Sequence, residues 1–210
     1  MGIDPSTGLQ PAATVDDDSS SSPVARPAGG VVYGSLTGYN GSRGHTIKLA
    51  ADGSFAGSYD FGWDSTPAVV GSAQDYRIVI KDNHYGADSQ GVDLGPYVIT
   101  ELDSSLKPVW RFKSTETHSC ERQLDGTLAC VEDHPHGFEW CINAPAVDRD
   151  GVTYVNSEDG NLYAINPDGT WRDKLFLEKS VGAAYTPLAL DHLGRVYSLN
   201  NGHLIVLGQQ

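Results

Sequence analysis

Three side chains of this 210-residue chain, Asp64, Asp82 and Asn143, have the chemistry to bind a hard cation. Each lies at the end of an apolar run or in the polar segment that follows one. Calcium prefers carboxylate and amide oxygens as ligands. We therefore expect Asp64, Asp82 and Asn143 to hold a Ca²⁺ ion if the fold brings them together.

Three further side chains, His84, His134 and Glu139, are candidates for proton transfer. An imidazole titrates near neutral pH and can take a proton from an attacking water, and a carboxylate can do the same. With a cation beside them, these residues predict hydrolysis of a small ester or lactone. The alternative is that they belong to solvated loops held in place by aromatic anchors.

The chain has three cysteines, Cys120, Cys130 and Cys141, within about twenty residues of His134. Their spacing matches no common closed zinc site, although a zinc cluster remains an alternative. Cys120 and Cys130 flank Asp125-Gly126, which is typical of a hairpin turn. We predict a disulfide from Cys120 to Cys130, with Cys141 free, and hence an extracellular or periplasmic protein. Pairing of Cys141 instead stays open.

Composition predicts an all-β scaffold for these residues. Glycine and proline number 24 and 11, and Asp-Gly or Asn-Gly pairs separate short runs rich in Val, Ile, Tyr and Leu. Such pairs tolerate the positive φ of tight turns between strands. No window of a dozen residues has apolar side chains at helical spacing. Residues 1–21 are instead polar, with consecutive aspartates and serines, and are expected to be a tail or linker.

A repeat organises residues 22–210. A small residue and a proline, followed by two small or apolar residues, recur around Pro23, Pro67, Pro145 and Pro187. Each landmark is followed by a second and a third apolar run, and in three repeats by a fourth. Four short antiparallel strands at a period of about 40 to 50 residues are typical of propeller blades. We expect repeats near 22–65, 66–143, 144–185 and 186–210, the last blade lacking its outer strand.

The stretch from Val147 to Ile165, VDRDGVTYVNSEDGNLYAI, resembles the repeat of the PQQ-like (quinoprotein alcohol dehydrogenase-like) β-propellers. The resemblance implies a β-propeller of four-stranded antiparallel blades over roughly residues 22 to 208. Such propellers usually have about seven or eight blades, whereas four repeats fit here. The adjacent cysteine pair of quinoprotein dehydrogenases is absent as well, so bound PQQ is not expected. An incomplete ring would leave open sheet edges through which the chain could self-associate.

Propeller topology sorts the loops onto two faces. Turns after the first and third strands of each blade are short, whereas the segments 82–96 and 114–143 are long and lie on the opposite face. Function is commonly displayed on such loops. The candidate residues above all fall on this long-loop face, so we expect any site to be there.

Several function classes are excluded. The chain has a formal net charge of −13 and no basic run, so nucleic acid is not an expected partner. No apolar stretch is long enough for a membrane span. The G-x-S-x-G, P-loop and G-x-G-x-x-G motifs are absent. Two functions remain: a calcium-assisted hydrolase of esters or lactones, similar in architecture to the calcium-dependent propeller lactonases, or a non-catalytic module that binds a protein or glycan.

Overall fold

The computed structural model describes residues 20–36, 43–85, 94–142, 144–182 and 186–208. The described residues form strands and turns and contain no helix. Accordingly, none of them forms a helix that could cross a membrane. The candidate residue Asn143 lies outside the described residues.

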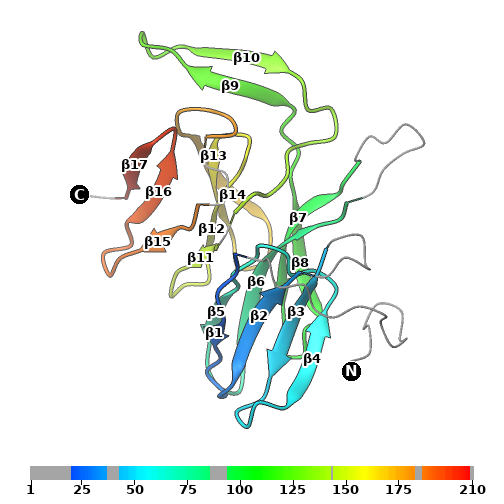
Figure 1. Cartoon of the computed structure of the whole chain (residues 1–210). Coiled ribbons are helices and arrows are strands. Elements are labelled where there is room, and N and C mark those ends of the chain that lie inside the picture. Colours follow the sequence, from blue (N-terminus) through cyan, green and yellow to red (C-terminus); the bar gives the residue numbers. More distant parts are fainter. Residues whose placement is uncertain (1–19, 37–42, 86–93, 143, 183–185, 209–210) are drawn as a thin grey trace.

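Seventeen strands form four sheets and one hairpin (Figure 1). Sheet 1 contains β1 (Val24–Ala25), β2 (Val31–Ser35), β3 (His45–Leu49) and β4 (Phe55–Tyr59). Sheet 2 contains β5 (Ala68–Gly71), β6 (Tyr76–Asn83), β7 (Tyr97–Leu102) and β8 (Pro108–Lys113). Sheet 3 contains β11 (Ala146–Val147), β12 (Thr153–Asn156), β13 (Asn161–Ile165) and β14 (Trp171–Phe176). Sheet 4 has β15 (Ala189–Leu190), β16 (Val196–Asn200) and β17 (His203–Leu207).

Each sheet is an antiparallel meander in chain order, and the first strands of successive sheets are neighbours: β1 contacts β5, β5 contacts β11, and β11 contacts β15. Figure 1 shows the sheets grouped around these strands. This arrangement is β-propeller-like, as predicted, and the last described sheet has three strands. The main difference from the sequence prediction is that β6 extends into the segment 82–96, because Asp82 and Asn83 pair with Val98 and Tyr97.

The core consists of three apolar layers, one between each pair of successive sheets. Between sheets 1 and 2, Ile78 and Ile80 of β6 pack with Val32, whereas Val79 of the same strand faces sheet 3. The alternation arises because successive strand residues point to opposite faces. The layer between sheets 2 and 3 contains the fully buried Trp140. Both faces of β6 are therefore covered, and its buried polar residues Lys81, Asp82 and Asn83 must find partners inside the protein.

The short turns are held by aspartates that accept hydrogen bonds from the turn backbone. Asp148 Oδ1 accepts from the N–H groups of Asp150 and Val152, and Asp191 Oδ1 accepts equivalently from Leu193 and Arg195. These contacts assign the Asp148-x-Asp150-Gly151 sequence to a turn. Sheet 1 has Arg26 at the start of its first turn instead. Arg26 reaches across to the hydroxyl of Tyr76 at 2.8 Å and ties sheet 1 to sheet 2.

A two-stranded hairpin interrupts the link between sheets 2 and 3. It comprises β9 (His118–Arg122) and β10 (Leu128–Glu132), and it projects beyond the four sheets in Figure 1. Its base is closed by Thr117, whose carbonyl accepts from the N–H groups of Asp133 and His134. The disulfide joins Cys120 to Cys130, which are directly paired across the two strands. The predicted disulfide and the hairpin turn at Asp125-Gly126 are confirmed.

Candidate functional site

Asp82 is a buried polar residue between sheets 1 and 2. Its side chain is fully buried, on the face of β6 that points to sheet 1. Oδ2 accepts hydrogen bonds from the hydroxyl of Tyr59 at 2.7 Å and from Thr100 at 2.8 Å. Arg111 donates to the Tyr59 oxygen at 3.1 Å, and its Nε lies 3.8 Å from Asp82 Oδ2. Four strands thus converge on one carboxylate.

His84, immediately after β6, contacts the other oxygen of this carboxylate. Its Nε2 lies 3.0 Å from Asp82 Oδ1, and its side chain is 39% exposed. A buried carboxylate on one ring nitrogen fixes the orientation of the imidazole and leaves the second nitrogen, Nδ1, for a proton from solvent or substrate. The arrangement can therefore act as an acid–base pair.

The environment of Asp82 keeps its carboxylate ionised. Burial raises its pKa, but the contact with His84 and the hydrogen bonds from Tyr59 and Thr100 outweigh burial, and the net pKa lies below the ordinary value. Tyr59 shifts in the opposite direction: burial and the Asp82 charge raise its pKa. The pair is a neutral phenol donating to a charged carboxylate at neutral pH.

A second polar cluster surrounds Lys81 on the opposite face of β6. The Lys81 side chain is 2% exposed, and its Nζ lies 5.9 Å from the centre of the Trp63 ring. Burial lowers its pKa, whereas Cys141, Asp64, Glu139 and Glu158 favour the charged form. The net pKa of Lys81 lies below its ordinary value, because burial outweighs the surrounding negative groups.

Two of the three predicted calcium ligands, Asp64 and Asp82, lie in different environments in the described residues. Asp64 belongs to the environment of Lys81, and its Oδ1 accepts from the Ser20 N–H at 2.7 Å. Asp82 faces the other side of β6, and both its oxygens contact protein donors. No group of three or more His, Cys, Asp or Glu in the described part of the chain is arranged to hold a metal. The third predicted ligand, Asn143, lies outside that part.

The predicted proton-transfer residues lie in separate environments. Glu139 Oε2 accepts from the Tyr85 hydroxyl at 3.2 Å, beside the Lys81 cluster. His84 contacts Asp82, whereas His134 lies at the base of the hairpin. Glu139 and His84 thus lie against opposite faces of sheet 2, and His134 belongs to the hairpin.

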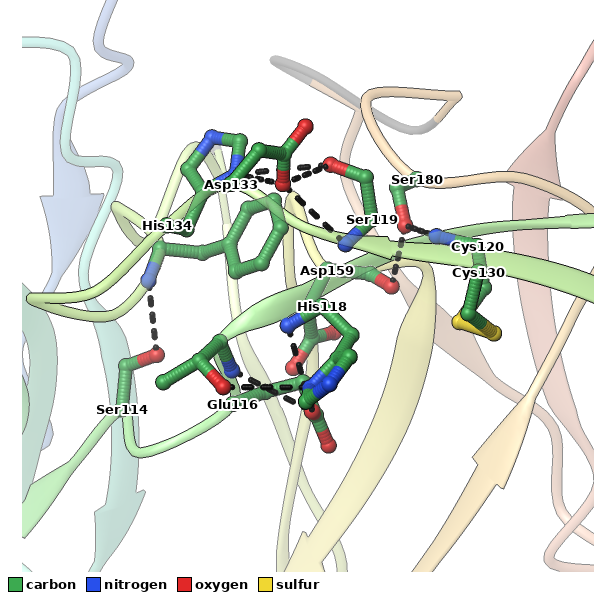
Figure 2. A network of polar contacts seen from close by, with 12 residues as sticks. Ser114, Glu116, His118, Ser119, Cys120, Cys130, Asp133, His134, Asp159 and Ser180 are labelled. Atoms are coloured by element: carbon green, nitrogen blue, oxygen red, sulfur yellow. Dashed lines mark hydrogen bonds and ion pairs between the residues drawn. A yellow bond between two sulfur atoms is a disulfide. The ribbon is translucent and has the colours of Figure 1, made fainter.

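His134 is part of a Ser–His–Asp cluster, drawn in Figure 2. Its Nδ1 lies 2.7 Å from Asp133 Oδ1 and 3.3 Å from Ser119 Oγ, and Ser119 donates to the same aspartate oxygen at 2.8 Å. A catalytic triad needs the serine and the aspartate on different ring nitrogens. Here both lie at Nδ1, and the ring stacks on Phe138. The cluster therefore anchors the base of the hairpin and lacks the geometry that activates a serine.

The hairpin is attached to the link that follows sheet 3. The Cys120 N–H donates to Ser180 Oγ at 2.7 Å, and the Ser180 N–H donates to the Cys120 carbonyl at 2.8 Å (Figure 2). Ser180 Oγ in turn donates to the carbonyl of Asp159. Lys179 adds an ion pair with Glu121 at 3.2 Å. These contacts hold β9 in a fixed position relative to sheet 3.

Cys141 is the cysteine outside the disulfide, and it is buried. Because Cys120 and Cys130 are bonded to each other, the zinc alternative that used all three sulfurs does not hold. Sequence reasoning missed Tyr59, Thr100, Arg111 and Ser180 altogether. No local signal marks them, since each meets its partner through strands that are distant in sequence.

Comparison with known proteins gives only distant structural similarity. No protein-family model matches the sequence, and no curated protein does. A protein of unknown function from Bacteroides caccae is 11% identical with a TM-score of 0.47, over 90% of this chain and 54% of that one. BamB from Moraxella catarrhalis is 14% identical with a TM-score of 0.39, over 94% of this chain and 62% of that one. The chain thus spans less than two thirds of either protein, and the PQQ-like assignment remains a resemblance.

Proposed function

We propose that this chain is a propeller-like binding module that holds a protein partner on its long-loop face, through the β9–β10 hairpin. The observation that supports it is the hairpin itself: every residue of β10 is exposed, yet the element is fixed by a disulfide and by the Ser180 hydrogen bonds. Exposed Leu124, Leu128 and Val131 give it apolar contact area. A rigid element with exposed apolar side chains binds with a small entropy cost.

The location follows from the same disulfide. Structural disulfides persist in oxidising compartments and are rare in the cytosol. An extracellular or periplasmic site of action is therefore part of the proposal.

The test removes the hairpin without disturbing the blades. Because the Thr117 carbonyl is hydrogen-bonded to the Asp133 N–H, residues 118–132 can be replaced by two glycines. Both proteins are used to select from a phage-displayed library of random linear peptides, with near-ultraviolet circular dichroism as the folding control. We expect peptides that bind the intact chain and lose at least tenfold in affinity for the shortened one. Equal enrichment by both proteins, or none by either, would reject the hairpin as a binding element.

A second function, hydrolysis of a small ester or lactone, is favoured by the Asp82–His84 pair. Nδ1 of His84 would take a proton from water, the resulting hydroxide would add to the carbonyl carbon, and the ester C–O bond would break as the proton passes to the leaving oxygen. Asp82 would orient the ring. The scheme uses only the protein's own Asp82 and His84.

Turnover of p-nitrophenyl acetate and a panel of lactones tests this function, with and without added Ca²⁺ and chelator. His84→Ala should lower kcat/KM about 100-fold. His118→Ala, which removes a half-exposed histidine from the hairpin, should leave it unchanged. Absence of turnover by the intact chain, or full activity of His84→Ala, would exclude the pair as a catalytic site. Activity that is lost on chelation would support the predicted calcium site.

A further inference from the structure

The outer edge of β10 presents backbone groups directed away from the protein. The N–H and C=O of Cys120 point to Ser180, and the Arg122 N–H points to Glu178, so these residues of β9 face away from β10. Cys120 and Cys130 are therefore a non-hydrogen-bonded pair. By the same alternation, the N–H and C=O groups of Leu128, Cys130 and Glu132 face outward on the far edge. They have no hydrogen-bond partner among the described residues.

This edge is held in one register. The disulfide lies in the middle of the two paired strands, and the turn is closed by hydrogen bonds between Gln123 and Thr127 and between Gly126 and Gln123. Strand β9 is fixed to Ser180 on its other side. A fixed edge strand is a template for pairing with an extended chain.

Grooves accompany both faces of the hairpin: Leu128 lines one, Ala129 and Val131 line the other, and Cys130 lines both. Leu128 and Cys130 line a groove of about 310 Å³ that is bounded by Lys174 and Phe176 of β14. Ala129 and Val131 line a groove of about 400 Å³ bounded by Val181. A strand added along β10 would direct its successive side chains alternately toward these two faces. The edge thus offers main-chain hydrogen bonds, and the grooves offer side-chain selectivity.

The charge of this region favours a basic partner. Residues 116–133 contain five carboxylates and a single arginine. Lys174 and Lys179 neutralise Glu116 and Glu121, which leaves the aspartates and Glu132 with an excess of negative charge. A second copy of the chain would bring another net charge of −13 to the same edge, and like charges oppose that pairing.

We propose that β10 accepts an extended, basic segment of a partner protein as an additional strand of the hairpin sheet. This inference rests on the proposed binding function and names the class of its partner. Recognition combines hydrogen bonds from the outward groups of Leu128, Cys130 and Glu132 with alternating side chains in the two grooves. The acidic side chains select lysine and arginine.

The first test uses a fluorescein-labelled peptide of sequence TKVRVKT and fluorescence anisotropy. We expect saturable binding with a Kd below about 1 mM, and no binding to the chain that lacks residues 118–132. The acidic counterpart TEVEVET should bind at least tenfold more weakly. Two N-methylated forms of the basic peptide, one at the valines and one at the basic residues, report on strand pairing. Successive residues of a strand direct their N–H groups to opposite edges. One methylated form should therefore lose at least tenfold in affinity, and the other should bind like the parent peptide.

A pair of protein variants tests the same hydrogen bonds by changing the protein instead of the peptide. Glu132→Pro removes an N–H that faces outward and leaves the pairing of β10 with β9 intact, as edge strands tolerate. Glu132→Gln removes the charge and keeps the N–H. We expect the proline variant to bind at least about threefold more weakly than the glutamine variant, with the disulfide formed in both.

Each outcome is decisive. If both N-methylated peptides bind like the parent, or both Glu132 variants bind equally, strand addition is overturned. If TEVEVET binds as well as TKVRVKT, the basic partner is overturned. If TKVRVKT does not bind while the library yields hairpin-dependent peptides, the inference fails and the binding function stands. If the free chain sediments as a dimer that Glu132→Pro dissociates, a second copy occupies the edge and the proposal is wrong.

Discussion

Replacing Asp82 with alanine is expected to lower the free energy of unfolding by about 3 kcal/mol. The change leaves the hydroxyls of Tyr59 and Thr100 without their buried acceptor and deprives His84 of its partner. Each buried polar group left unsatisfied costs about 1 to 3 kcal/mol. Urea denaturation followed by tryptophan fluorescence measures the loss.

The control is Asp75→Ala, at the other end of β6. Asp75 also contacts an arginine, Arg77 at 3.9 Å, but its side chain is 78% exposed. An exposed ion pair contributes less than about 1 kcal/mol, so this variant should resemble the parent. Equal effects of the two substitutions would show that the Asp82 network does not stabilise the fold.

The same network predicts an acid-dependent loss of stability. The pKa of Asp82 in the folded protein lies below its ordinary value, so its contribution is present in full above a pH of about 4. It is lost as the pH falls through the folded-state pKa, because both states are then protonated. Asp82→Asn cannot titrate, and its stability should therefore fall less steeply in acid than that of the parent. Parallel acid profiles would contradict this assignment.

The second large effect is expected for Gly169→Ala, at about 3 kcal/mol of lost stability. Gly169 has a φ of +81°, which disfavours alanine by about 1 to 2 kcal/mol. A Cβ there would also lie 2.5 Å from Cγ of Trp110, a buried residue of sheet 2. Overpacking of this kind adds about 1 to 3 kcal/mol.

Gly53→Ala separates the cost of the backbone conformation from the cost of the steric contact with Trp110. Gly53 occupies the corresponding turn of sheet 1 with a φ of +82°, and a Cβ there meets nothing within 4 Å. Both glycines follow an aspartate that accepts from the N–H and hydroxyl two residues on, Asp52 with Ser54 and Asp168 with Thr170. Chemical denaturation should show a difference of at least about 1 kcal/mol between the variants. If the two lose the same stability, contact with Trp110 is not a constraint.

The strands were predictable because their signals are local. Alternating apolar runs such as His45–Leu49, separated by Asp-Gly turns, encode strand and turn within a few residues. The Cys120–Cys130 pairing was predictable for the same reason, since the two residues are ten positions apart and flank one turn. Recurrence of these local signals predicted the sheets in their chain order.

The site was predictable only in part. His84 was identified as a candidate base, but Asp82 was assigned to a metal, because no local pattern shows that Tyr59 and Thr100 would be its donors. Those partners are 23 and 18 residues away and arrive on other strands. Likewise, Ser119 and Asp133 both contact Nδ1 of His134, and only the geometry of the hairpin base decides that they lie at the same ring nitrogen.

By itself, therefore, the sequence determined the period of the strands, the positions of the turns and the disulfide, since each depends on neighbours along the chain. Tertiary structure alone decided which sheet each polar residue of β6 faces and which groups surround it. Lys81 lies in the electrostatic environment of the Asp64 and Glu139 carboxylates, whereas Asp82 contacts the hydroxyls of Tyr59 and Thr100 and the ring of His84. Tertiary structure also distinguished Gly53 from Gly169, whose local sequences are alike. The physical reason is that burial brings together groups from separate strands, and their contacts depend on how the sheets pack rather than on any spacing along the chain.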